Sequence, residues 1–219
     1  GVVREHNTTR ALFADPQHPY TKKLLSSEPS GEANPLPEGS QTILEGRDVR
    51  VAFTLKTGTF FKSSYSQLVA VNDLSITLKK HETLGLVGES GSGKTTFGQA
   101  LMRLIHSDGG TVLFDEKHIE GLSRDQMRPL RSRMQVVFQD PFSSLNPRMT
   151  IGQIIEEGLI VNNIGSSGKD RNERVRDALV DAGLPGSITH RFPHEFSGGQ
   201  RQRIAIARAV ALEPEFILL

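Results

Sequence analysis

The sequence predicts an α/β fold organised around one strand, loop and helix unit, and three observations support this prediction. The first is the glycine-rich octapeptide Gly88–Thr95, which fits the pattern G-x-x-x-x-G-K-[ST]. The second is the apolar run Thr83–Val87 in front of it, which has the length of a buried strand. The third is the helical spacing of the apolar residues after it, namely Phe97, Ala100, Leu101, Leu104 and Ile105.

The octapeptide, called the P-loop below, is predicted to hold the phosphates of a nucleotide. Its glycines let the backbone fold tightly with N–H groups pointing inward, and the N-terminus of the following helix adds partial positive charge. Lys94 is expected to reach the β- and γ-phosphates, and the Thr95 hydroxyl to bind Mg²⁺. The alternative is a flexible loop with an incidental lysine, and the strand and helix in register argue against it. The residues expected to contact the nucleotide here are Gly88, Glu89, Ser90, Gly91, Ser92, Gly93, Lys94, Thr95 and Thr96.

Composition excludes several other classes of protein. The 219 residues carry a formal net charge of +1, which argues against a general nucleic-acid-binding surface, and they contain no cysteine for disulfides, iron–sulfur centres or thiolate zinc sites. No apolar run approaches the roughly 18 residues that cross a bilayer, and no signal-peptide pattern is present. We therefore expect a cytoplasmic polypeptide that reaches a membrane only through a partner. Surface or capping roles, rather than metal binding, are predicted for His6, His18 and His190.

Residues 1–41 differ in composition from residues 42–219, so a domain boundary is predicted near Thr42. Two short helical pieces broken at prolines are expected within Ala11–Leu25, and the following residues up to Gln41 have the proline, glycine and serine content of a linker. The chain starts at Gly1 rather than methionine and finishes on the strand-like run Glu215–Leu219. We therefore expect a piece of a longer protein.

Strands are predicted around the P-loop unit from alternating or continuous apolar runs. Thr42–Leu55, Leu68–Leu78 and Thr111–Phe114 are expected to form an antiparallel patch together with the strand in front of the P-loop, the last of them after the turn Asp108–Gly110.

Two further segments extend the α/β pattern. The run Met134–Phe138 predicts a core strand that delivers Gln139 to its carboxyl end, where α/β sheets bind ligands. An ordinary exit from a strand is the alternative for Gln139. The apolar spacing of Lys169–Ala182 predicts a helix that Gly183 closes.

A small polar turn opens the next predicted helix. Phe196–Gln200 precedes the alanine- and arginine-rich segment Arg201–Leu212, so its N–H groups and the helix dipole form a second candidate anion site. A serine cap with unimportant glycines explains the same residues equally well when they are taken alone. The residues of interest are Ser197, Gly198, Gly199 and Gln200.

Taken together, these motifs resemble the ATPase domain of ATP-binding cassette (ABC) proteins. The P-loop matches the Walker A motif, and Gln139 matches the glutamine of the Q-loop. Phe196–Gln200 matches the signature motif Leu-Ser-Gly-Gly-Gln, with phenylalanine in place of leucine. Phe216–Leu219 matches the apolar half of Walker B. The resemblance covers about residues 42–219. It implies a P-loop NTPase fold with an antiparallel β subdomain and a helical signature subdomain.

A narrower likeness points to the di- and oligopeptide importer branch of that family. Phe138–Thr150 and Arg191–Phe196 look like segments of this branch, which also carries a His-Pro-Tyr-Thr element near the end of its ATPase subunits, as in His18–Thr21. That element in front of a Walker A implies two fused cassettes, with residues 1–41 the tail of the first plus a linker, as in microcin C-type peptide uptake ATPases. The adenine-stacking aromatic is assigned by this likeness to Tyr65, with Phe60 and Phe61 as alternatives.

The resemblance also implies cofactors, partners and a location. ATP and Mg²⁺ are the expected cofactors, with Lys94 and Gln139 as catalytic residues and Thr95 and Gln139 on the metal. Ser197 and its glycines are expected to act on the ATP of a second cassette. Integral-membrane permease subunits, and indirectly a periplasmic solute-binding protein, are the other expected partners, at the cytoplasmic face of the inner membrane. The family's catalytic glutamate and switch histidine are not among residues 1–219, so these residues alone are expected to be inactive.

Other members of the same superfamily provide the alternatives. A ribosome-associated translation factor with paired cassettes carries a long charged linker, whereas the linker here is short and rich in proline and glycine. A DNA-repair ATPase inserts a long coiled coil between Walker A and the signature, and no sustained heptads are present. A P-loop kinase or GTPase is disfavoured by Ser197–Gln200.

Overall fold

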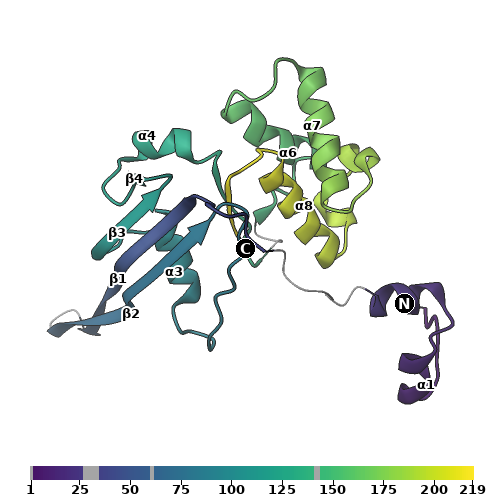
Figure 1. The fold of residues 1–219 in the computed structure, drawn as a ribbon, viewed down its shortest axis with the longest axis horizontal. Helices are drawn as coiled ribbons and strands as arrows, with labels where there is room; N and C mark the ends of the chain where they lie inside the picture. Colours follow the sequence, from purple (N-terminus) through teal and green to yellow (C-terminus); the bar gives the residue numbers. More distant parts are fainter. Residues whose placement is uncertain (1, 27–34, 60–61, 141–143) are drawn as a thin grey trace. The chain divides into compact units, whose positions relative to one another are not determined.

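The computed structural model describes residues 2–26, 35–59, 62–140 and 144–219, which fall into two compact units, Gly1–Glu38 and Gly39–Leu219 (Figure 1). The first unit contains helices α1 (Thr9–Ala14) and α2 (Pro19–Leu25), as the sequence predicts.

The first unit is held by polar caps rather than by an apolar core. His18 caps α2 by accepting the N–H of Tyr20 at Nδ1, 3.1 Å away, so the predicted capping role is confirmed for this histidine. The Glu5 carboxylate accepts the N–H groups of Gln17 and His18 at 2.8 and 3.0 Å. These bonds, after a larger contribution from the Thr21 side chain, lower the pKa of Glu5.

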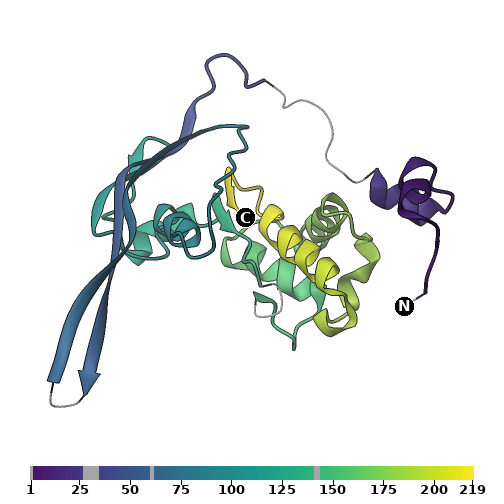
Figure 2. The same cartoon turned by 90° about the horizontal axis from the view of Figure 1, so that it is seen from below.

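A four-stranded antiparallel sheet opens the second unit. Its strands are β1 (Thr42–Thr59), β2 (Lys62–Lys79), β3 (Gly109–Phe114) and β4 (Lys117–His118), in the spatial order β2-β1-β3-β4. The three antiparallel strands predicted from the sequence are therefore confirmed. Strands β1 and β2 form a long hairpin (Figure 2).

The strand predicted in front of the P-loop is not formed, and that prediction was wrong. Residues 83–87 join neither sheet of the described chain, and Leu84, Leu86 and Val87 are 48%, 45% and 93% exposed. The physical reason is that a strand needs a neighbour for its backbone hydrogen bonds, and no strand of the described chain pairs with residues 83–87.

The P-loop helix α3 (Lys94–Leu101) is shorter than its apolar spacing predicts. Phe97, Ala100 and Leu101 are buried as expected. The helix ends there because Arg103 takes a left-handed conformation with φ of 53°, so the predicted continuation through Leu104 and Ile105 was wrong. Leu104 lies beyond the helix and is 42% exposed.

The residues that pack beneath the sheet form one hydrophobic cluster, the sheet core. Helix α4 (Arg124–Met127) and the 3₁₀ helix η1 (Arg128–Leu130) adjoin it through Met127. The buried members of the sheet core are Ile43, Leu44, Val49, Val51, Val71, Phe97, Ala100, Leu101, Met102, Val112, Phe114, Ile119, Met127, Met134 and Phe216.

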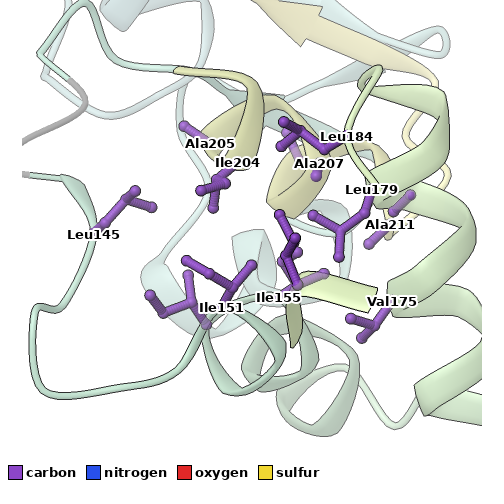
Figure 3. Close-up of a cluster of buried hydrophobic side chains, with 14 of the residues drawn as sticks. Leu145, Ile151, Ile155, Val175, Leu179, Leu184, Ile204, Ala205, Ala207 and Ala211 are labelled. Carbon is purple, nitrogen blue, oxygen red and sulfur yellow. The ribbon is translucent and has the colours of Figure 1, made fainter. Parts of the chain in front are cut away.

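A second cluster, the helical core, fills the space between helices (Figure 3). The elements around it are α6 (Ile151–Val161), α7 (Gly168–Asp181), the 3₁₀ helices η2 (Gly186–His190) and η3 (Pro193–Glu195), and α8 (Gly198–Val210). Its buried members are Val137, Leu145, Ile151, Ile154, Ile155, Leu159, Val175, Ala178, Leu179, Leu184, Ile188, Phe196, Ile204, Ala205, Ala207, Ala209 and Ala211.

Local sequence explains where these helices begin and end. Thr150 and Gln153 form a reciprocal capping box at the start of α6, a helix that the sequence analysis did not predict. Gly183 follows α7 with φ of 72° and donates its N–H to Val180 O, so the predicted stop is confirmed.

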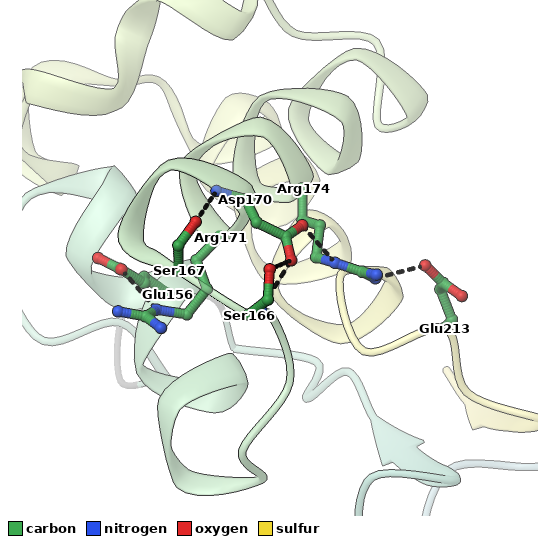
Figure 4. Close-up of polar contacts among 7 residues, drawn as sticks. All are labelled: Glu156, Ser166, Ser167, Asp170, Arg171, Arg174 and Glu213. Atoms are coloured by element: carbon green, nitrogen blue, oxygen red, sulfur yellow. Dashed lines mark hydrogen bonds and ion pairs between the residues drawn. The ribbon is translucent and has the colours of Figure 1, made fainter.

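Polar contacts at the start of α7 connect it to its neighbours (Figure 4). Arg171 pairs with Glu156 of α6 at 3.0 Å, and Arg174 bridges Asp170 at 3.2 Å and Glu213 at 2.8 Å. The hydrogen bond from the Ser166 backbone is the largest influence that lowers the pKa of Asp170. All these side chains are partly exposed, so each pair adds at most about 1 kcal/mol.

Two short parallel strands lie between the two cores. Strand β5 (Met134–Val136) pairs with β6 (Phe216–Leu218), and Val137 N–H extends the ladder to Leu218 O at 2.8 Å. Met134 and Phe216 belong to the sheet core, whereas Val137 belongs to the helical core and Ile217 packs against it. The alternation of side chains along the strands therefore serves both cores.

An arginine fixes the start of this parallel pair. The Arg133 guanidinium binds Asp115 at 2.7 Å and also binds both oxygens of Glu215, and it stacks over the Phe114 ring at 5.0 Å. The hydrogen bonds from Arg133 hold the pKa of Asp115 and Glu215 below their ordinary values. These contacts join the β3–β4 turn to the residues at the start of β5 and β6.

Removing buried volume from the helical core is expected to destabilise the second unit. Ile155 is fully buried on α6, and Ile155→Ala should lower the free energy of unfolding by about 2–5 kcal/mol. Ile160→Ala on the same helix is the matched control, because Ile160 is 53% exposed. Urea denaturation of both variants checks this, and equal losses would contradict the assignment of the core.

Candidate nucleotide site

The P-loop wraps around the ammonium group of its own lysine. Lys94 Nζ donates to Gly88 O at 2.7 Å, Glu89 O at 2.5 Å and Ser92 Oγ at 3.4 Å. Gly91 and Gly93 take left-handed φ angles of 81° and 90°, which favour glycine. The loop is therefore curved around a positive charge at the first residue of α3, an arrangement that fits the phosphates of a nucleotide.

The loop is seated directly on strand β2. A Cβ atom on Gly93 would come within 2.2 Å of Ala70 O, so only glycine allows this approach. On the other side of the site, Gly98 of α3 packs on Leu218 of β6, where a Cβ atom would meet a Leu218 methyl carbon at 2.9 Å. The P-loop helix is thus supported by both β2 and β6.

Thr95 and Thr96 stand in the first turn of α3, Thr95 exposed and Thr96 half-buried. Thr95 is thus accessible to solvent, and its predicted contact with Mg²⁺ stays a prediction. Hydroxyl and amide oxygens are ligand types that Mg²⁺ accepts beside phosphate oxygens.

Gln139 is exposed and lies beyond the last residue of β5. Because β5 pairs with β6, and α3 packs on β6, Gln139 leaves the sheet from the strand adjoining the one that supports the P-loop helix. The structure thus agrees with the prediction that Gln139 follows a core strand.

The signature residues form a capped helix start in the helical core. Ser197 is the N-cap of α8, where its Oγ accepts the Gln200 N–H at 3.4 Å and Gln200 Oε1 accepts the Ser197 N–H at 3.0 Å. Gly198 and Gly199 are exposed, and a Cβ atom on Gly199 would meet nothing within 4 Å. The structure confirms the serine cap, and the exposed glycines leave room for the anion that the other interpretation requires, which stays a prediction.

Tyr65 lies within β2, which begins at Lys62 rather than at the predicted Leu68, so Tyr65 does not precede the strand. Tyr65 pairs with Lys56 across the hairpin, and Lys56 Nζ lies 6.0 Å from the centroid of the Tyr65 ring. Tyr65 is 65% exposed. At about 3.3 Å per residue, Tyr65 is roughly 16 Å along the strand from Ala70, which touches the P-loop. Phe60 and Phe61 lie outside the described residues.

Phe53 is an exposed aromatic that the sequence analysis did not single out. It is 43% exposed on β1, opposite Leu68 and therefore nearer in register to Ala70 than Tyr65 is. The sequence around Phe53 has the alternation of an ordinary strand and does not indicate a contact with nucleotide. Only the pairing of β1 with β2 places Phe53 near the P-loop.

The structure therefore groups the predicted residues into two sets. The P-loop and Gln139 are linked through the β5–β6 pair, whereas Ser197–Gln200 cap a helix of the helical core. Among the hydrogen bonds and ion pairs of the described residues, none joins the P-loop to the signature turn. One chain thus presents two separate candidate anion sites.

Comparison with known proteins identifies the family. The family model described as "ABC transporter" matches residues 71–219. The chain is 52% identical over its whole length to the uncharacterized ABC transporter ATP-binding protein YejF of Escherichia coli (strain K12), of which it spans 41%. It is 48% identical over 81% of its length to the oligopeptide transport ATP-binding protein AppF of Bacillus subtilis (strain 168), covering 54% of that protein.

Solved structures agree with the sequence comparison. The dimeric post-hydrolysis structure of the ATP-binding cassette MJ0796 bound to ADP and Pi has a TM-score of 0.69 and 30% identity, over 80% of this chain and 72% of that one. The chain therefore belongs to the ABC transporter family, and it has the fold of an ABC ATPase cassette. No helix in the described parts of the chain has the length and apolar character that a bilayer crossing requires.

Removing the lysine ammonium is expected to weaken nucleotide binding. A hydrogen bond to a charged group contributes about 1.5–3 kcal/mol, so Lys94→Ala should raise the dissociation constant for Mg-ATP roughly 10- to 150-fold. Lys169→Ala, in the first turn of α7, is the matched control and should leave binding unchanged. Calorimetric titration measures both, and unchanged affinity in Lys94→Ala would contradict the P-loop assignment.

Proposed function

We propose that this chain is the ATP-binding and ATP-hydrolysing part of a transporter that imports peptides or peptide-like compounds. The observation that carries the proposal is the pair of separate anion sites, one around Lys94 and one at the start of α8. A P-loop and a signature turn on one chain form a complete phosphate site only when two cassettes face each other. The name of the Bacillus subtilis relative, which states oligopeptide transport, supports the substrate class.

The arrangement of the longer protein is part of the proposal. Residues 1–41 are the tail of a preceding cassette plus a linker, and residues 42–219 are most of the second cassette of a fused pair of the microcin C uptake type. In support, the Escherichia coli relative matches residues 1–219 throughout and is more than twice as long as this chain. The separation of the first unit at Glu38 agrees with a boundary in this region.

The proposed partners complete the nucleotide site and provide the path for the solute. The second cassette supplies the signature for the nucleotide on Lys94, and integral-membrane permease subunits provide the path for the solute. A periplasmic solute-binding protein acts on those subunits, and nucleic acid has no part. The chain then works as a peripheral subunit at the cytoplasmic face of the inner membrane.

In the mechanism, the protein positions groups and balances charge. Lys94 and the P-loop amides hold the β- and γ-phosphates, and Thr95 and Gln139 are the residues that would hold Mg²⁺. Bound Mg²⁺ neutralises charge on the phosphates. Gln139 also places the attacking water. A carboxylate after the Walker B run, the residue that orients or deprotonates this water, is not among residues 1–219, so these residues alone are proposed not to turn over ATP.

The Ser197→Arg substitution tests the division of labour between two cassettes. The test uses a protein extended through the catalytic glutamate after Walker B and the switch histidine. In it, Ser197→Arg should abolish hydrolysis, because a long cationic side chain replaces the small serine that faces the nucleotide of the opposite cassette. ATP binding at Lys94 should persist, since Ser197 makes no contact with that loop. Phosphate release and calorimetric binding check both halves, and loss of ATP binding would refute the shared site. Residues 1–219 alone should release phosphate no faster than background.

The aromatic that stacks on the adenine can be identified by two alanine substitutions. The family resemblance assigns this role to Tyr65, whereas the strand register favours Phe53, because Phe53 pairs with Leu68, two residues from Ala70, which the P-loop approaches. Stacking on one base contributes about 1–3 kcal/mol. Phe53→Ala should therefore weaken ATP binding roughly 5- to 150-fold, and Tyr65→Ala should leave it unchanged. The opposite pattern in a calorimetric titration would return the role to Tyr65.

A further inference from the structure

The residue in front of the signature serine is fixed by an arginine on its ring. Phe196 belongs to the helical core and is 5% exposed. The guanidinium carbon of Arg191 lies 4.7 Å from the centroid of its ring. A leucine side chain at this position offers no aromatic face for such a contact, so the stacking depends on the phenylalanine of this sequence.

The guanidinium is itself held in place by Glu195. Arg191 Nε donates to Glu195 Oε2 at 2.9 Å, and the other carboxylate oxygen accepts the Phe192 N–H at 2.7 Å. The carboxylate is therefore tied to the backbone on one side and to the guanidinium on the other. The backbone bond, followed by the bond from Arg191, lowers the pKa of Glu195.

The backbone of the same turn is anchored at both ends. Ile151 N–H, at the start of α6, donates to Arg191 O at 2.8 Å, and Arg201 Nε of α8 donates to Phe196 O at 3.0 Å. Phe196 is extended, with φ of −113° and ψ of 148°, and Ser197 begins the helix directly after it. The contacts that fix Phe196 therefore also fix the orientation of Ser197 and of the start of α8.

We propose that Arg191 is a positioning residue for the signature turn, which it orients through its stacking on Phe196 and its pairing with Glu195. The proposal rests on the proposed function, in which Ser197 and the glycine amides face the nucleotide of a second cassette. Arg191 touches neither nucleotide nor Ser197. Its effect is to keep the open amides at the start of α8 at a constant angle.

Substitutions in the full-length protein, assayed with its second cassette, test this role. Arg191→Met keeps the length of the side chain and removes its charge, and it should lower kcat about 2- to 5-fold, the size expected for loss of one exposed cation–π contact. ATP affinity at Lys94 should stay unchanged, the melting temperature should fall by no more than about 4 °C, and Arg191→Lys should keep part of the activity. Arg203→Met is the matched control, because Arg203 donates to Gly183 O at 3.2 Å, away from the signature turn.

A double-mutant cycle separates stacking from other effects of Arg191. Phe196→Leu should lower kcat by a similar factor, and Arg191→Met should then add little in the Phe196→Leu background. Full additivity of the two losses, a kcat for Arg191→Met equal to that of Arg203→Met, or a fall in melting temperature that accounts for the loss would overturn the proposal.

Hydrogen exchange gives a readout that does not depend on ATP turnover. Arg191→Met should speed amide exchange in the peptide carrying residues 197–200 and leave α7 unchanged. Unchanged exchange in that peptide would overturn the positioning role. If exchange responds as expected while the unsubstituted protein does not hydrolyse ATP, the proposed function fails and the local role of Arg191 stands.

Discussion

The parallel pairing of β5 with β6 is the constraint on which the rest of the second unit depends. The two strands are short, yet their alternating side chains enter both hydrophobic cores, with Phe216 in the sheet core and Ile217 against the helical core. Arg133 fixes where the pairing starts, because it binds residues in front of β6 and beyond β3. Loss of this register would separate the two cores, since a shift by one residue exchanges the faces of every side chain.

Both candidate anion sites take their positions from these cores. Helix α3 lies on Leu218 of β6 and presents the P-loop, while Gln139 leaves the neighbouring strand β5. The start of α8 is presented from the helical core by Ser197, with Phe196 buried behind it. The two sites are thus fixed relative to different cores of one unit, which is the arrangement that a nucleotide shared between two cassettes needs.

Local patterns in the sequence were sufficient for the antiparallel strands, helices α7 and α8, and the P-loop, because the strands have apolar runs, the two helices have apolar spacing and a serine cap, and the P-loop has its own motif. Local patterns gave wrong or missing predictions where the structure of a segment depends on the strand that pairs with it. Residues 83–87 have the composition of a strand but no neighbour in the described chain, and Phe53 comes near the P-loop only through the register of β1 on β2. Helix α6 could have been found, because Thr150 and Gln153 form a capping box before its apolar residues. The contact of Arg191 with Phe196 has no sequence signal beyond the presence of the two residues.

Complementation between two inactive variants tests the central claim most directly. The cassette extended through the catalytic glutamate and the switch histidine is prepared as Lys94→Ala and, separately, as Ser197→Arg, and phosphate release is measured for each and for their mixture. If Ser197 serves the nucleotide of the opposite cassette, a mixed dimer contains one site with an intact lysine and an intact signature, so mixing should restore turnover that neither variant has alone. If both residues served the same nucleotide within one chain, every site in the mixture would stay broken. Absence of turnover in a mixture shown to form mixed dimers would contradict the account.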